Sequence, residues 1–131
     1  MKMKIITPDG YVWDREIEEV ILPSSTGQLG ILAHHAPLLT ALDIGVMRAK
    51  TAQGWVALVL FGGFAEVLNN QITILVNGAQ EAHEIDLQHA QQEEAKALEQ
   101  LQQAATPTAQ IEARQNLAKW RARVQAVSFQ I

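Results

Sequence analysis

The chain has 131 residues, of which 48% are hydrophobic and 18% are charged, and its formal net charge is −4. This composition is typical of a globular domain with a small appendage and excludes a disordered chain. The absence of cysteine excludes disulfide bonds, thiolate metal sites and thiol switches. The longest apolar stretch, residues 55–64, is shorter than the roughly 20 residues of a membrane-spanning helix. No apolar segment of a secretory signal follows Lys2 and Lys4.

All eight glycines lie at or before Gly78, and this asymmetry divides the chain into two parts. Up to about residue 77, short β-branched runs alternate with Gly, Pro, Asn and Asp, which is typical of strands and turns. From Asp86 onward, Ala, Gln, Glu, Leu and Arg recur with helical spacing. We therefore expect an all-β domain over residues 1–84 and a helical region over residues 85–131.

The first part has the regularly spaced short runs of an antiparallel β-sandwich or flattened barrel, with about ten strands in all. The strand-like runs cover residues 2–7, 12–13, 16–22, 28–33, 38–42, 46–50, 55–61, 64–68 and 71–76. Turns are expected at Pro8-Asp9-Gly10 and Pro23-Ser24, and Gly62-Gly63 suits a tight bend between strands. Asn69-Asn70 suits a two-residue hairpin turn, because asparagine tolerates positive φ.

The second part predicts an antiparallel α-helical hairpin, interrupted at residues 104–108. Asp86 suits the N-cap of the first helix, whereas Thr106 and Pro107 suit the start of the second. Because alanine-rich stripes bury little apolar area per turn, we expect stable helices that dock weakly, which suits a conformational switch. The residues expected to pack within the hairpin are Leu98, Leu101, Leu117, Trp120 and Val124.

The net charge lies entirely in residues 1–84, whereas residues 85–131 are neutral but polarised. The first helix is mostly acidic, and the basic residues of the second are Arg114, Lys119, Arg121 and Arg123. These side chains form either a solvated face or an electrostatic docking surface for an acidic segment of another subunit. Trp120 is either hairpin core, the favoured interpretation, or an interface hot spot. No basic patch with interleaved aromatics indicates nucleic-acid binding.

Residues with catalytic or metal-binding potential are sparse. His34-His35 has no third ligand nearby, and His83 and His89 lack the spacing of a helical ligand pair, so no metal site is expected. Residues 27–30 lead into a strand and lack the helix N-terminus of a phosphate loop. Since no Ser–His–Asp constellation is supported either, we expect neither an enzyme nor a cofactor. A β-sandwich that binds sugars or peptides, and a small hydrolase, are the competing function classes.

Residues 22–42, which read LPSSTGQLGILAHHAPLLTAL, strongly resemble the epsilon subunit of F-type ATP synthases. Residues 62–67 and 70–76 also match that family, as does the order of β domain and helical hairpin. The resemblance therefore covers essentially the whole chain. Residues 72–77 and the Arg-Ala-Arg near the end are most similar to the cyanobacterial and chloroplast branch, in which the catalytic portion is called CF(1).

This resemblance implies a non-catalytic rotor subunit of a proton-translocating ATP synthase. In the family, the sandwich binds the gamma subunit and the membrane-embedded ring of c subunits, and thereby couples the ring to the catalytic head. The ring contact corresponds here to Gln28, His35, Ala36 and Pro37. Many relatives have an acidic residue at the position of Gln28, which would form a neutral hydrogen bond instead of an ion pair.

The family also implies a regulatory role for the hairpin, residues 85–131. When extended along gamma, its basic second helix meets an acidic segment of a catalytic beta subunit and inhibits ATP hydrolysis. The residues that correspond to this contact are Arg114, Lys119, Arg121 and Arg123.

Some bacterial relatives bind ATP on the folded hairpin through an Ile-Asp-x-x-Arg-Ala motif, which places a possible nucleotide contact at Asp86. Residues 85–90 read IDLQHA, so His89 replaces the arginine and lacks its charged, forked phosphate donor. ATP sensing is therefore not expected. The resemblance further implies that the complex alone attaches the chain to a membrane. The expected location is the stromal or cytoplasmic side of a thylakoid membrane or, alternatively, a bacterial plasma membrane.

Overall fold

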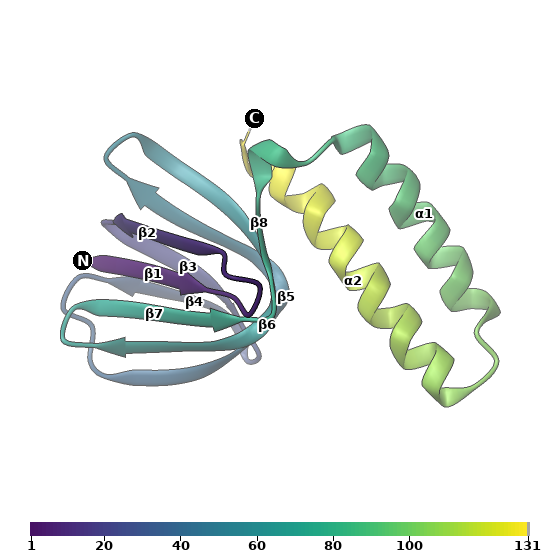
Figure 1. Ribbon diagram of the computed structural model, residues 1–131, viewed down its shortest axis with the longest axis horizontal. Coiled ribbons are helices and arrows are strands. Elements are labelled where there is room, and N and C mark those ends of the chain that lie inside the picture. Colours follow the sequence, from purple (N-terminus) through teal and green to yellow (C-terminus); the bar gives the residue numbers. More distant parts are fainter. Residues whose placement is uncertain (131) are drawn as a thin grey trace.

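The computed structural model describes residues 1–130, so residue 131 of the expected hairpin range lies outside the described residues. A β-sandwich forms the first part and a pair of antiparallel helices forms the second, which confirms the expected fold class (Figure 1). The strands are β1 (Lys2–Ile6), β2 (Val12–Glu16), β3 (Glu19–Ser24), β4 (Gly27–Leu32), β5 (Leu38–Thr51), β6 (Gly54–Leu68), β7 (Gln71–Val76) and β8 (Ala79–Glu81). The 3-10 helix η1 (Ala82–Glu84) precedes α1 (Leu87–Gln103) and α2 (Pro107–Gln130).

The strands belong to one sheet that folds over on itself, in the order β2-β1-β7-β6-β5-β3-β4, with β8 paired to β6. The long strands β5 and β6 pair with each other on both sides of Asp43 and Gly62 and contribute to both layers. Residues 63–68 of β6 pair with β7 in one layer, and residues 58–60 pair with β8 in the other. Among the described strands, only the β1–β7 pair is parallel, which the expectation of a purely antiparallel sandwich did not include.

Two long strands replace four of the short strands expected from the sequence. We expected breaks at residues 43–45 and at Gly62-Gly63, but β5 and β6 continue through these positions. Gly62 and Gly63 have φ angles of 80° and 153°, and a Cβ on Gly63 would lie 2.1 Å from the Leu75 carbonyl oxygen. The strand therefore turns a corner that requires glycine.

The expected turns are confirmed at two positions and wrong at a third. Asn69 and Asn70 connect β6 to β7 with φ angles of 52° and 60°, as a two-residue hairpin turn requires, and residues 8–10 turn between β1 and β2. Pro23-Ser24, by contrast, lies within β3. The register between β3 and β5 shifts between Ile21 and Ser24, and such a bulge tolerates proline without a backbone N–H.

The main core lies between the two layers of the sandwich. Its fully buried side chains are large and aliphatic, and they include Met3, Ile5, Leu22, Ile31, Met47, Leu58, Leu60, Ile72 and Ile74. Residues 57–60 of β6 are all buried, because one face of the strand points into this core and the other is covered by α2. This two-sided burial explains why the apolar run is continuous in the sequence.

The helices begin at the expected caps and lie folded on the sandwich. The Asp86 side chain accepts a hydrogen bond from the His89 N–H at 3.1 Å, and Thr106 Oγ1 accepts one from the Ala109 N–H at 3.1 Å. α2 packs against β5 and β6, and α1 packs on α2 (Figure 1). Within residues 1–130, no helix is both long and apolar enough to cross a membrane.

The face of α2 that touches the sandwich differs from the stripe expected in the sequence. Ala122 and Ala126 are buried in a small cluster with Ala57 and Val59 of β6. The stripe expected on the second helix faces α1, since its member Trp120 packs on His89, so α2 has two apolar faces. Alanine on one face gives only a weak hydrophobic pattern, so the sequence does not predict the face that contacts the sandwich.

Candidate functional site

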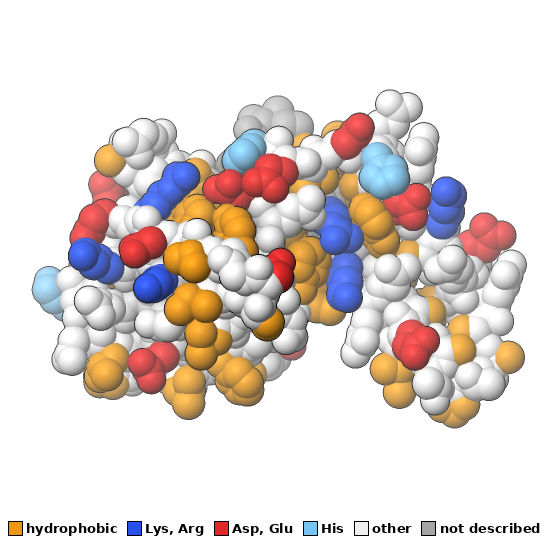
Figure 2. Space-filling view, viewed as in Figure 1, with side chains coloured by type: hydrophobic (Ala, Val, Ile, Leu, Met, Phe, Trp, Pro, Cys, Tyr) orange, Lys and Arg blue, Asp and Glu red, His pale blue; other side chains and the backbone are white. Residues whose placement is uncertain are grey.

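A groove separates α2 from the corner of β5 and β6. Its sandwich wall includes Asp43, Phe61 and Asn77, and its helix wall includes Arg114, Lys119 and Arg123. Figure 2 shows Lys and Arg side chains gathered where the sandwich meets the hairpin. The groove is therefore strongly cationic on the helix side.

The four basic residues of α2 have different surroundings. Arg114 and Arg121 are exposed, whereas Lys119 and Arg123 are half-buried. Burial lowers the pKa of the Arg123 guanidinium from its usual value, although arginine stays charged in proteins at neutral pH. The structure brings Arg114, Lys119 and Arg123 to one groove and directs Arg121 to a second hollow, beside Ile44.

Arg123 contacts the sandwich directly. Its Nε donates a hydrogen bond to Gln80 Oε1 at 2.9 Å, and its guanidinium carbon lies 4.9 Å from the Phe61 ring centroid. On the helix side, the same guanidinium lies 4.2 Å from the ring centroid of Trp120. Phe61 and Gln80 were not among the residues singled out in the sequence, because they are distant from Arg123 along the chain.

The residues expected to pack within the hairpin are buried to different degrees. Leu117 is only 4% exposed, and Leu101, Trp120 and Val124 are half-buried. Leu98 is 39% exposed and therefore lies at the rim of the hairpin. The side chains of α1 that are fully buried are instead Ala90 and Ala97.

Asp86, the position of the possible nucleotide contact, serves as the N-cap of α1. His89, which stands at the arginine position of the ATP-binding motif, packs edge-to-face on Trp120 with ring centroids 5.6 Å apart. Both positions therefore contribute to the structure of the hairpin itself.

The residues assigned to the ring contact lie at opposite ends of β4. This strand ends the order of the sheet, so its outer backbone edge has no partner strand within residues 1–130. Gln28 is exposed near its start, and His35, Ala36 and Pro37 follow its end. The His34 N–H donates a hydrogen bond to Asn70 Oδ1 at 2.8 Å, which ties this loop to the β6–β7 turn.

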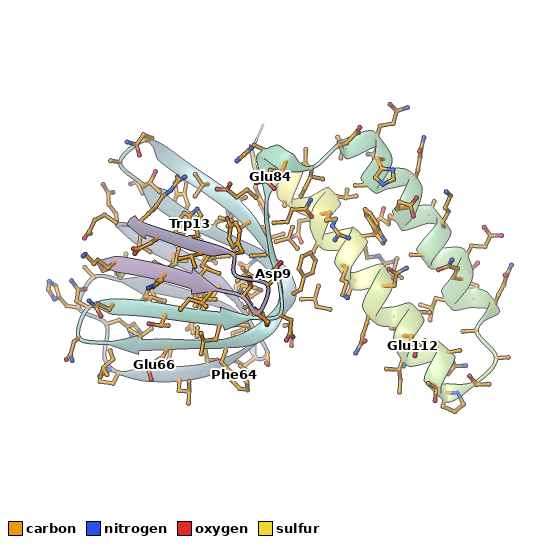
Figure 3. All side chains as sticks on the ribbon, viewed as in Figure 1. Asp9, Trp13, Phe64, Glu66, Glu84 and Glu112 are labelled. Carbon is orange, nitrogen blue, oxygen red and sulfur yellow. The ribbon has the colours of Figure 1, made fainter. Side chains whose placement is uncertain are left out.

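The outer face of the other layer carries a line of apolar side chains, here called the apolar stripe. The register places its members next to one another on five adjacent strands, and they are Val12, Ile6, Leu75, Phe64 and Ala41. Val12, Phe64 and Leu75 are 53%, 56% and 54% exposed. Figure 3 shows Phe64 projecting outward from the lower side of the sandwich, where hydrophobic side chains also gather in Figure 2. A contiguous exposed apolar patch of this kind indicates an interaction site.

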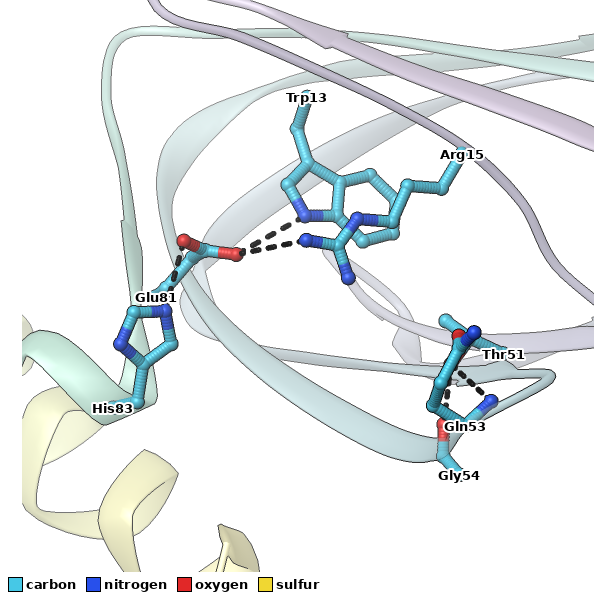
Figure 4. Close-up of polar contacts among 7 residues, drawn as sticks. All are labelled: Trp13, Arg15, Thr51, Gln53, Gly54, Glu81 and His83. Carbon is cyan, nitrogen blue, oxygen red and sulfur yellow. Dashed lines mark hydrogen bonds and ion pairs between the residues drawn. The ribbon is translucent and has the colours of Figure 1, made fainter.

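A polar network joins the sandwich to the start of the hairpin (Figure 4). Glu81 of β8 accepts a hydrogen bond from Trp13 Nε1 at 3.2 Å and lies within 4.0 Å of the Arg15 guanidinium. Its other oxygen is 3.0 Å from His83 Nε2. Burial, with a smaller effect of the nearby Glu81 and Glu84 charges, raises the pKa of Tyr11.

The same network contains the one group of three possible metal ligands in the described part of the chain. The ligand atoms of Glu81, His83 and Glu84 lie within 4.8 Å of one another. The contacts of Glu81 to Trp13 and Arg15 account for its position without an ion. This proximity has no signal in the sequence beyond the closeness of the three residues along the chain, and it was not among the predicted features.

Comparison with known proteins identifies the family. A family model described as the beta-sandwich domain of the ATP synthase delta/epsilon chain matches residues 1–82. The chloroplastic ATP synthase epsilon chain of Porphyra purpurea is 58% identical over 128 residues, which cover 98% of this chain and 96% of the relative. The chain belongs to the epsilon-chain family of ATP synthases.

Other members of the epsilon-chain family support the same placement. The ATP synthase epsilon chain of Thermosynechococcus vestitus is 55% identical over 129 residues, with 96% and 94% of the two chains covered. A chain in the cryo-EM structure of Euglena gracilis mitochondrial ATP synthase, comprising OSCP, F1 and c-ring, has the same fold. Its TM-score is 0.82 at 19% identity, with 95% of this chain and 79% of that chain covered. These findings confirm the family, its chloroplast and cyanobacterial branch, and a non-catalytic subunit in place of a hydrolase.

Proposed function

We propose that the chain is a rotor subunit that couples the c-ring to the catalytic head through gamma and inhibits ATP hydrolysis through its helices. In this proposal, residues 1–84 attach the chain to the stalk and residues 85–131 regulate it. The names of the epsilon-chain relatives support the proposal, as do the c-ring assemblies that contain the structural neighbours. A second neighbour comes from the central stalk and c-ring of Tetrahymena thermophila mitochondrial ATP synthase, with a TM-score of 0.62.

The apolar stripe is the observation that carries the coupling role. Stable protein interfaces have an apolar centre, and the stripe supplies a line of aliphatic and aromatic side chains across five strands. Ile6, Pro8, Phe64 and Leu75 also line a shallow hollow along the stripe, which offers a seat for a partner's apolar side chain. We assign this face to gamma.

The edge of β4 suits the ring contact. Gln28 at one end and the loop of His35, Ala36 and Pro37 at the other leave this whole strand available to a partner. Gln28 offers an amide that both donates and accepts hydrogen bonds. Contact with the ring would hold the chain on the stromal or cytoplasmic side of a thylakoid membrane or, alternatively, on a bacterial plasma membrane.

The groove and its surroundings suit the inhibitory role. Arg114, Lys119, Arg121 and Arg123 all lie on α2, and three of them also line the groove. An acidic segment of a beta subunit, with alpha beside it, is the complementary partner, because buried arginine–carboxylate pairs are strong and geometrically specific. Asp86 and His89 are both engaged within the hairpin, as the N-cap of α1 and as a ring partner of Trp120.

Replacement of a stripe residue by a charge tests the coupling role. We expect Phe64→Asp to abolish co-purification with gamma while the circular dichroism spectrum of the isolated chain stays unchanged, because Phe64 is exposed. Leu32→Asp is the matched control, since Leu32 is 61% exposed on β4, away from the stripe. Unchanged co-purification of the Phe64 variant would reject the gamma assignment.

Removal of residues 86–131 tests the inhibitory role. This truncation keeps β8, which pairs with β6, so the sandwich and its assembly should survive. We expect ATP hydrolysis by the assembled complex to rise. An unchanged rate would reject the inhibitory role and leave the coupling role in place.

A further inference from the structure

The surface that holds the hairpin on the sandwich is chemically unusual, because its centre is made of small side chains. Ala122 and Ala126 of α2 are 4% and 0% exposed and pack against Ala57 and Val59. Ile44, Val46 and Ile85 are only partly buried around this centre. Since hydrophobic stabilisation scales with buried apolar area, the two alanines themselves contribute little to holding the helix. Contacts around this centre therefore contribute much of what keeps the hairpin docked.

Two reciprocal arginine–aromatic contacts flank this centre. Arg123 of the helix lies 4.9 Å from the ring centroid of Phe61 of the sandwich, and Arg48 of the sandwich lies 4.4 Å from that of Phe129 of the helix. Such contacts are strongest where water is partly excluded. Phe129 is itself 36% exposed, whereas Arg123 is half-buried and also donates a hydrogen bond to Gln80.

Arg123 therefore makes the more enclosed of the two contacts. Its guanidinium has Phe61 on the sandwich side and Trp120 on the helix side, and its Nε–H is used by Gln80. A planar, forked group suits this combination of stacking and hydrogen bonding, which a lysine ammonium does not reproduce. Arg121, two residues earlier on the same helix, is exposed and carries the same charge.

We propose that Arg123 is the latch of the docked hairpin, and that docking and binding of an acidic partner compete for its guanidinium. The latch follows from the geometry of the isolated chain. The competition rests on the proposed inhibitory function, because it requires that Arg123 contact a carboxylate when the hairpin leaves the sandwich. A partner that binds the released helix must first break the contacts of Arg123 with Phe61 and Gln80, so docking and partner binding oppose each other at this side chain.

The latch is tested in the full chain with two spin labels. The sequence has no cysteine, so Ala52→Cys on the sandwich and Ala105→Cys at the hairpin tip, both exposed, give a single label pair. We expect Arg123→Gln to raise the ratio of undocked to docked molecules about tenfold, which corresponds to about 1.4 kcal/mol. Arg123→Lys should behave similarly, because it keeps the charge but loses the planar group.

Arg121→Gln is the matched control for loss of charge. It should leave the distance distribution between the labels unchanged. An equal response of the Arg121 and Arg123 variants would overturn the latch, and so would a distribution in which Arg123→Gln stays fully docked.

The competition is tested by ATP hydrolysis in the assembled complex. Phe61→Leu and Gln80→Ala release Arg123 without removing it, so both should strengthen inhibition. Arg123→Gln also releases the hairpin but removes a partner contact, so its inhibition should be weaker than that of the Phe61 and Gln80 variants. Equal inhibition by all three would overturn the competition. Failure of the proposed function would differ, since truncation after residue 85 would then leave hydrolysis unchanged while the label distances still report the latch.

Discussion

The sandwich and the hairpin are held by different kinds of contact. The sandwich encloses large aliphatic side chains between two layers, and its two longest strands take part in both layers. The hairpin rests on the sandwich through Ala122 and Ala126, and α1 fully buries only Ala90 and Ala97 of its own side chains. The difference teaches that the volume of the side chains at an interface sets how firmly two parts of one chain are held together, and here it favours a firm sandwich and a less firmly held hairpin.

Substitution of Gly63, at the corner of β6, should destabilise the sandwich more than any other change proposed here. Gly63→Ala would place a Cβ 2.1 Å from the Leu75 carbonyl oxygen at a φ of 153°. We expect a loss of about 3 kcal/mol or more in the free energy of unfolding of the sandwich, measured by chemical denaturation. Gly30→Ala is the control, because no atom lies within 4 Å of its added Cβ. Similar denaturation curves for the two variants would contradict the role of the corner.

A larger side chain at the surface where α2 packs on the sandwich should weaken docking of the hairpin and leave the stability of the sandwich unchanged. Ala126 is 0% exposed, so Ala126→Leu has no space and should weaken docking by about 1–3 kcal/mol. The amide chemical shifts of Ala57 and Val59 should move, while the melting temperature of the sandwich stays the same. Ala95→Leu, at an exposed position of α1, should change neither quantity. A cooperative fall in the stability of the whole chain would show that the two units are not separable.

Removal of a helix cap tests whether the hairpin can be destabilised while the sandwich stays unchanged. Asp86→Ala removes the acceptor of the His89 N–H and should destabilise α1 by about 1 kcal/mol. Amide exchange should increase in the first turn of α1 and stay unchanged in β1 to β8. Thr106→Ala is the companion variant and should act on the first turn of α2 instead. Faster exchange in the sandwich after either change would argue against independent units.

The smallest expected effect is a pH dependence at the β1–β2 turn. The Thr7 hydroxyl, and then the Tyr11 N–H, lower the pKa of the Asp9 carboxyl below its usual value. A depressed folded-state pKa means that the contribution of Asp9 is present above about pH 4 and is lost as pH falls through the folded value. Asp9→Asn should therefore flatten the acid side of the stability profile of the sandwich. Asp14→Asn, an exposed position on β2, is the control for loss of charge.

The sequence predicts the fold well wherever one local signal decides the outcome. The helix caps at Asp86 and Thr106 depend on hydrogen bonds to residues three positions later, and the hairpin turn depends on the φ angles of Asn69 and Asn70 alone. These three predictions are confirmed. The prediction that a strand ends at Gly62-Gly63 is wrong, because glycine is needed both where strands end and where one strand turns a corner. The prediction of a turn at Pro23-Ser24 is wrong for a similar reason, since a proline without a backbone N–H is tolerated both in turns and at a β-bulge.

The candidate site was less predictable, because tertiary contacts create it. The basic residues of α2 are visible in the sequence, but nothing local separates Arg123, which is half-buried, from the exposed Arg121. The apolar stripe likewise depends on the register of five strands, including the parallel β1–β7 pair. Its members lie far apart in the chain and alternate with buried residues, so no single run shows it.

The unbroken passage of β5 and β6 around the corner has a mechanical consequence. The layer that carries the apolar stripe and the layer that seats α2 share two continuous backbones, joined by hydrogen bonds on both sides of the bend. A displacement at the face that carries the apolar stripe therefore reaches the strands under α2 through two paired backbones, without depending on side-chain contacts between the layers.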